Sequence, residues 1–151
     1  KELHLNIGYA NSVLGVSRLG SVGVAISCGF LIDRFNLKRI MFPMMVAAGV
    51  FTIFMGLVSV RYMGVVLFLQ ALFITGFFPV GLVAIAKIFN REMRGLATGM
   101  ILAASMVVGS GVVPWLLGVS GDLYSFRLGI IILGVLTTAA STLIFRLKEL
   151  D

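Results

Sequence analysis

The sequence predicts an all-α, polytopic membrane protein with about five transmembrane helices. Of its 151 residues, 60% are hydrophobic and 12% are charged, and the mean hydropathy is +1.11. A soluble domain carries about 25% charged residues, so this chain cannot cover a water-exposed surface. Its apolar runs are continuous over the roughly 20 residues that a helix needs to cross the hydrocarbon core. A membrane β-barrel is excluded, because it requires alternating segments of about ten residues.

Five apolar runs are long enough to cross the bilayer, and short charged connections separate them. The connections read DRFNLKR, SVRY, NREMR and GDLYSFR, and none resembles a soluble domain or a linker. Because the chain begins with Lys1 and shows no signal-peptide pattern, we interpret it as a fragment that lacks its N-terminal part. The predicted spans are residues 8–32, 40–60, 62–89, 95–120 and 128–145.

The distribution of basic residues over the connections predicts the orientation. Alternate connections form two sets, and the richer set faces the cytoplasm by the positive-inside rule. The first span then enters from outside, and the C-terminus is cytoplasmic. The expected location is the plasma membrane, in bacteria the inner membrane. The richer set holds Arg34, Lys38, Arg39, Lys87, Arg91, Arg94, Arg146 and Lys148, and the poorer set holds Lys1, Arg61 and Arg127.

The connection after the first span, GFLIDRFNLKR, combines a small residue, an acid and three bases. Gly29 is predicted to let a neighbouring helix approach closely. Asp33 falls at the helix end, where its carboxylate can pair with a base or accept from the N–H groups that start another helix. Asn36 is expected in the left-handed conformation of a tight turn. The simpler interpretation is a basic cytoplasmic anchor with a helix-ending Asp.

The spacing Gly29-x-x-x-Asp33-Arg34-x-Asn36-x-Lys38-Arg39 resembles the signature loop of the major facilitator superfamily, with Asn36 in place of a Gly. The later stretch FNREMRGLATGM resembles the basic loop that this family places before helix 11. The resemblance implies that the five spans are helices 8 to 12 of a transporter. It also implies a cytoplasmic latch, in which Asp33 engages Arg94 or the start of the span at residue 95. A weaker internal echo, Gly118-x-x-x-Asp122, agrees with the inverted repeats of such transporters.

Arg18 is the one charge deep inside a predicted span, since Lys87 lies two residues from the end of its span. Arg18 precedes Asp33 by fifteen residues, or about 22 Å of helix. A charge at membrane depth is functional by default, and a guanidinium suits carboxylates and other oxyanions. Two interpretations stay open: Arg18 binds an anionic substrate in a central cavity, or it reaches the outer interface or pairs with the missing half. Further candidate substrate ligands are Asn11, Gln70 and Thr75.

The third and fourth spans contain residues that break helices. Proline removes a backbone hydrogen bond and kinks a helix, and broken helices at membrane depth often mark gates or substrate sites. We predict that both spans bend, and a static kink is the alternative. The second and fifth spans carry only Ser and Thr as polar groups, which fits the family resemblance, since it implies that these two spans face lipid. The candidate hinges are Gly76, Pro79, Gly81, Gly111 and Pro114.

Enzyme chemistry is not expected from these residues. No predicted span contains Asp or Glu, and the sequence has no metal-ligand cluster, no nucleophile–base pair and no phosphate-binding loop. We therefore expect no catalytic residue, no metal and no cofactor. Nucleic acid is not an expected partner either, because the bases sit in short clusters between apolar runs.

The expected function is secondary transport of a small solute by alternating access, with an organic or inorganic anion as the favoured substrate class. Two alternatives remain: efflux of drugs or neutral solutes, and a non-transporting membrane sensor of the same fold. The expected partners are the solute, the lipid bilayer and the missing N-terminal bundle of the same chain. The family resemblance implies a monomer.

Overall fold

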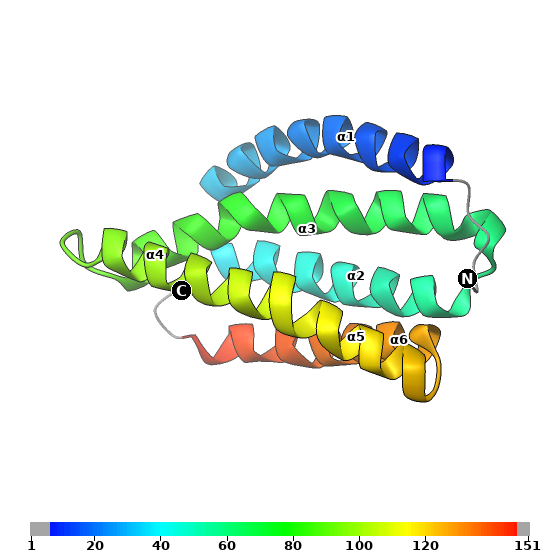
Figure 1. The fold of residues 1–151 in the computed structure, drawn as a ribbon. Helices are drawn as coiled ribbons and strands as arrows, with labels where there is room; N and C mark the ends of the chain where they lie inside the picture. The colour runs from blue at the N-terminus through cyan, green and yellow to red at the C-terminus, as the bar shows by residue number, and fades with distance from the viewer. Residues whose placement is uncertain (1–6, 148–151) are drawn as a thin grey trace.

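The computed structural model describes residues 7–147, which form a bundle of long helices (Figure 1). No strand occurs within these residues, so the predicted all-α class is confirmed. The elements are α1 (Ile7–Arg34), α2 (Leu37–Leu57), α3 (Val60–Ile88), α4 (Arg94–Met106), the π-helical turn η1 (Val107–Val112), α5 (Val113–Leu123), α6 (Phe126–Ser141) and the 3₁₀ turn η2 (Thr142–Arg146).

The lengths of these helices match the thickness of a bilayer. Four stretches are long and apolar enough to cross it: Leu37–Leu57, Arg61–Ile88, Arg94–Leu123 and Phe126–Arg146. The third of these runs through α4, η1 and α5, and the fourth through α6 and η2. Helix α1 has 28 residues, or about 42 Å at a rise of about 1.5 Å per residue. All five helical runs begin and end within three residues of the predicted spans.

The start of α2 differs from the prediction because Asn36 caps this helix. Its backbone has φ −59° and ψ 133°, and its side-chain Oδ1 accepts a hydrogen bond of 3.1 Å from the backbone N–H of Lys38. The predicted left-handed conformation is therefore wrong. An N-capping Asn satisfies one of the free N–H groups in the first helical turn. Helix α2 consequently begins at Leu37, three residues before the predicted start of the second span.

Helices α2 and α6 approach each other backbone to backbone. A Cβ atom added to Gly134 would lie 2.7 Å from the backbone N of Ile53 and 2.8 Å from the carbonyl oxygen of Gly49. A Cβ on Gly56 would lie 2.9 Å from the carbonyl oxygen of Arg127. Small residues at such crossings let membrane helices pack closely where no hydrophobic force drives them together.

Helix α3 lies between α1 and α2 (Figure 1) and contacts both. The three helices meet at Gly76, where an added Cβ would lie 2.8 Å from Val24 Cγ1 and 2.9 Å from Met44 Cε. An added Cβ at Gly29 meets nothing within 4 Å, so the predicted close approach does not occur there within the described residues. The face of α1 that packs on α3 instead includes Gly20, whose added Cβ would lie 3.1 Å from a Leu72 methyl.

The buried apolar core is concentrated at one end of the bundle. It joins the end of α1, the start of α2, the end of α3 and η2, and next to it the rings of Phe42 and Phe145 lie 4.6 Å apart. In the most apolar part of the run Arg94–Leu123, none of the residues is buried. The molecule therefore has one tightly packed end and one loosely attached helix. The core residues are Cys28, Leu37, Ile40, Met41, Val80, Ala84 and Ile144.

The substitution Gly134→Ala should lower the free energy of unfolding by about 1–3 kcal/mol, the usual cost of overpacking. The added methyl group would meet the backbone of Ile53 and of Gly49 at less than 3 Å. The change is measured by thermal unfolding of the purified protein in detergent.

Gly99→Ala is the matched control, because Gly99 is exposed on α4 and an added Cβ meets nothing within 4 Å. Alanine is favoured over glycine in a helix at both positions, so the difference between the variants reports the steric clash. Equal unfolding temperatures for the two variants would contradict the close contact of α2 with α6.

Candidate functional site

The residues of the predicted signature loop gather at the packed end of the bundle. Arg34 is the last residue of α1, and Lys38 and Arg39 lie in the first turn of α2. Arg34 and Arg39 are exposed, whereas Lys38 is buried. Figure 1 shows the end of α1 and the start of α4 at this same end of the molecule. The basic side chains around two connections, α1–α2 and α3–α4, therefore share one end of the bundle.

Asp33 opens onto a hollow between α1 and α3. The hollow has a volume of about 370 Å³, and its walls include Gly29, Phe30 and Val83. The side chain of Asp33 is exposed, and no ion pair or hydrogen bond to it occurs among residues 7–147. In this conformation the carboxylate of Asp33 is accessible to water and to a basic side chain that moves towards it.

Arg94, the predicted partner of Asp33, makes a different contact. Its Nε donates a hydrogen bond of 3.1 Å to the carbonyl oxygen of Phe89, the residue that follows α3. This bond ties the first residue of α4 to the end of α3. Among the described residues the structure does not bring Arg94 and Asp33 together, and the latch between them stays a prediction.

Gln70 faces α2. Its Nε2 donates a hydrogen bond of 2.7 Å to Thr52 Oγ1, and Thr52 Oγ1 donates one of 2.8 Å to the carbonyl oxygen of Ala48. Thr52 is buried between the helices. This polar chain fastens α3 to α2, which favours a structural role for Gln70 over the predicted role as a substrate ligand. Thr75 is half-buried on the same helix.

The other two candidate ligands lie on α1. Asn11 and Arg18 belong to the helix Ile7–Arg34, and their backbone is helical. Their side chains lie outside the described part of the structure. The backbone puts Arg18 sixteen residues before Arg34, or about 24 Å along the helix, and its function stays a prediction.

The predicted hinges have different surroundings. Pro79 lies inside α3, next to Gly81, whose added Cβ would lie 3.9 Å from a Phe77 ring atom. Gly76 is buried where three helices meet, so close packing already accounts for a glycine there. Gly111 lies in the π-helical turn, and Pro114 lies in the first turn of α5. Whether these residues act as hinges stays a prediction.

The π-helical turn was not predicted from the sequence. Val107–Val112 forms η1, and the N–H of Val113 binds the carbonyl oxygen of Val108, five residues back. π turns are rare insertions in α-helices and occur frequently at functional sites. The glycines at 109 and 111 lower helix propensity, and the run Arg94–Leu123 has 30 residues, yet neither signal specifies a π turn.

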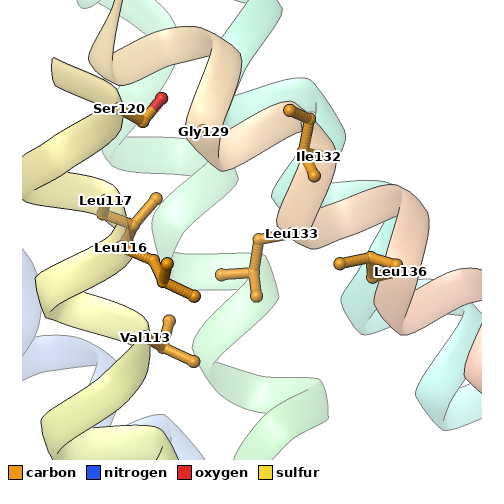
Figure 2. Close-up of a pocket in the computed structure, with 8 residues that line it drawn as sticks. All are labelled: Val113, Leu116, Leu117, Ser120, Gly129, Ile132, Leu133 and Leu136. Atoms are coloured by element: carbon orange, nitrogen blue, oxygen red, sulfur yellow. The ribbon is translucent and has the colours of Figure 1, made fainter. Parts of the chain in front are cut away.

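An apolar groove of about 240 Å³ separates α5 from α6 (Figure 2). Its one polar side chain, Ser120, donates a hydrogen bond of 3.0 Å to the carbonyl oxygen of Ser125. The groove therefore fits an apolar chain or helix and has no free polar group for a polar solute. It is lined by Val113, Leu116, Leu117, Ser120, Gly129, Ile132, Leu133 and Leu136.

Long apolar helices joined by short basic loops define an integral membrane protein of the helical-bundle class. A family model described as Major Facilitator Superfamily matches residues 1–150. The chain belongs to this family of membrane transporters, which are not enzymes. A search of curated proteins finds no match to the chain.

The bond between Gln70 and Thr52 should show as coupling in a double-mutant cycle. Each of Thr52→Val and Gln70→Leu is expected to destabilise the protein by about 0.5–2 kcal/mol, the range for hydrogen bonds between membrane helices. The double variant should lose less than the sum of the single losses. Unfolding in detergent measures all three variants.

Thr137→Val is the control, because Thr137 Oγ1 donates only to the carbonyl oxygen of Leu133 in its own helix. Its combination with Gln70→Leu should be additive. Additive losses for the pair Thr52 and Gln70 would count against the bond and return Gln70 to the candidate substrate ligands.

Proposed function

We propose that this chain is the C-terminal half of a secondary transporter that moves a small organic or inorganic anion by alternating access. The observation that carries the proposal is the family match over residues 1–150 together with one arginine inside the helix Ile7–Arg34. The five helical runs correspond to helices 8 to 12, and a second bundle completes the cavity. Substrate binds between the bundles, and the two ends of the cavity open in turn.

Arg18 is the proposed anion contact. Its position within a 28-residue helix supports this role, because a charge far from both helix ends needs water or a partner of opposite charge. A planar guanidinium binds carboxylate and phosphate oxygens in pairs. Substrate oxyanions supply the negative charge that is absent at this depth, since none of the predicted spans contains Asp or Glu.

The packed end is proposed to face the cytoplasm. Seven described bases lie in or near the helix ends and connections at this end, whereas two, Arg61 and Arg127, lie at the other end. The positive-inside rule then sets the orientation, with the C-terminus inside. The seven are Arg34, Lys38, Arg39, Lys87, Arg91, Arg94 and Arg146.

The arrangement of the helices supports a further helix that is not part of this chain. Helix α3 fills the angle between α1 and α2, while the angle between α5 and α6 holds an open apolar groove. The stretch Gly118-x-x-x-Asp122 in α5 repeats Gly29-x-x-x-Asp33 in α1. If the chain is an inverted repeat, the groove receives the counterpart of α3 from the N-terminal part of the protein.

Uptake by the full-length protein in proteoliposomes tests the transport function and the role of Arg18. Wild type should take up at least one member of a panel of carboxylate, phosphate and inorganic anions with saturation. Arg18→Gln should reduce this uptake at least tenfold, because it removes the charge while it keeps a side chain of similar length. Arg18→Lys keeps the positive charge but loses the planar guanidinium that binds two oxygens, so it should retain part of the uptake.

Uptake that survives Arg18→Gln would leave a transporter in which Arg18 is structural. Flux of neutral or cationic solutes alone would favour the efflux alternative. No flux of any solute would favour the non-transporting sensor.

Asp33→Asn tests the cytoplasmic latch. If Asp33 engages a base or a helix start in the inward-closed state, its neutralisation shifts the protein towards the inward-open state. Cysteine residues introduced on α1 should then react faster with a maleimide added from the cytoplasmic side. Asp122→Asn, at the opposite end of the membrane, is the matched control, and equal labelling of the Asp33 variant and wild type would refute the latch.

A further inference from the structure

Among the described residues, the fourth span contacts the bundle near its two ends, and its middle is exposed. Ala97 of α4 is buried, and Arg94 is bonded to the Phe89 carbonyl at the end of α3. At the other end an added Cβ on Gly129 would lie 2.8 Å from Ser120 Oγ and 3.0 Å from a Leu117 methyl, so α5 packs tightly on α6. Every residue from 99 to 112 is exposed. Figure 1 shows α4 and α5 as one continuous run across the bundle.

The π turn lies in this exposed part, and it changes how the two packed ends are aligned. At about 100° per residue, an unbroken α-helix would point Val113, Leu117 and Ser120 about 140–200° away from Ala97. A π turn takes up one extra residue, which reduces that angle to about 40–100°. In this structure the burial of Ala97 and the contact of Leu117 and Ser120 with Gly129 of α6 occur together with the spare residue.

We propose that η1 is a register switch. While both ends are packed, the spare residue is held as a π turn; when α4 leaves α3, the residue is absorbed into continuous α-helix and α4 rotates by about 100° relative to α5. Helix α4 is the half that moves, because α5 is held by the close contact at Gly129 and α4 by one buried alanine and one exposed arginine. The rotation carries Arg94 away from the end of α3.

The link of this rotation to gating rests on the proposed function, whereas the rotation itself does not. When Arg94 changes position at the packed end, the set of basic groups that can contact Asp33 changes. No side chain resists the change within residues 99–112, since none of them is buried. The glycines at 109 and 111 keep both forms free of side-chain crowding, and an added Cβ at either would meet nothing within 4 Å.

Deletion of Ser110 tests the switch, because it removes the spare residue and allows continuous α-helix with both packing contacts kept. Spin labels are placed at Met100, exposed on α4, and Ile74, exposed on α3, in a background where Cys28 is replaced by Ala. Distances are measured by pulsed electron resonance on the full-length protein in nanodiscs. Wild type should give two distance populations, and the deletion variant should give one.

Two controls separate chain length from side-chain chemistry. Ser110→Ala keeps the length and should keep both populations. The deletion of Ser110 combined with one alanine inserted after residue 102 restores the spacing from Ala97 to Val113, and both populations should return. The deletion variant should unfold at or above the wild-type temperature, since it retains the contacts at Ala97 and Gly129.

One population in wild type, or two in the deletion variant, would overturn the switch. So would a deletion variant that fails to fold while Ser110→Ala folds, because the residue would then not be spare. Uptake that is lost in the deletion variant and kept in Ser110→Ala would show that gating requires the switch. Uptake that is kept in both variants would show that it does not. If distances behave as expected but wild type transports nothing, the proposed function fails and the switch stands.

Discussion

The bundle depends on the backbone contact between α2 and α6 at Gly49 and Gly134. In lipid, apolar area does not draw one helix to another, so close packing and hydrogen bonds decide which helices pair. Hydroxyl groups beside the contact do not obstruct it: Thr138 donates to the Gly134 carbonyl, and Ser141 to the Thr138 carbonyl. Helix α2 then positions α3 through Gly76, α3 positions α1, and α6 positions α5.

This order of attachment makes the molecule stiff at one end and compliant at the other. The buried cluster and the Phe42–Phe145 pair join four elements at the basic end. Away from that end, contacts are mostly pairwise between neighbouring helices. A change of conformation therefore meets least resistance in the run Arg94–Leu123, where no residue of the most apolar part is buried. That run also holds the π turn, the least regular backbone of the described spans.

The helix ranges followed from the sequence because the thickness of hydrocarbon allows few helix lengths and each connection carries charge. The conformation of Asn36 did not, since asparagine is favoured both in left-handed turns and at N-caps. The sequence also did not predict that Gln70 faces α2. Helix α3 is apolar on all sides, so no hydrophobic face shows which side of the helix is buried. The π turn lies between Ala97, which is buried on α4, and α5, which packs on α6 at Gly129, and contacts so far apart in sequence leave no local pattern.

Polar groups within the described spans are largely satisfied by the helices themselves. Gln70 and Thr52 satisfy one another, and Ser27 donates to the Gly23 carbonyl of its own helix. Arg18 differs in kind, because a positive charge needs a negative one or water. No predicted span contains Asp or Glu, so in the proposed function the anion that meets Arg18 comes from outside the predicted spans. A substrate, a lipid headgroup and a carboxylate on another helix all meet that condition, and the substrate alone arrives and leaves during a transport cycle.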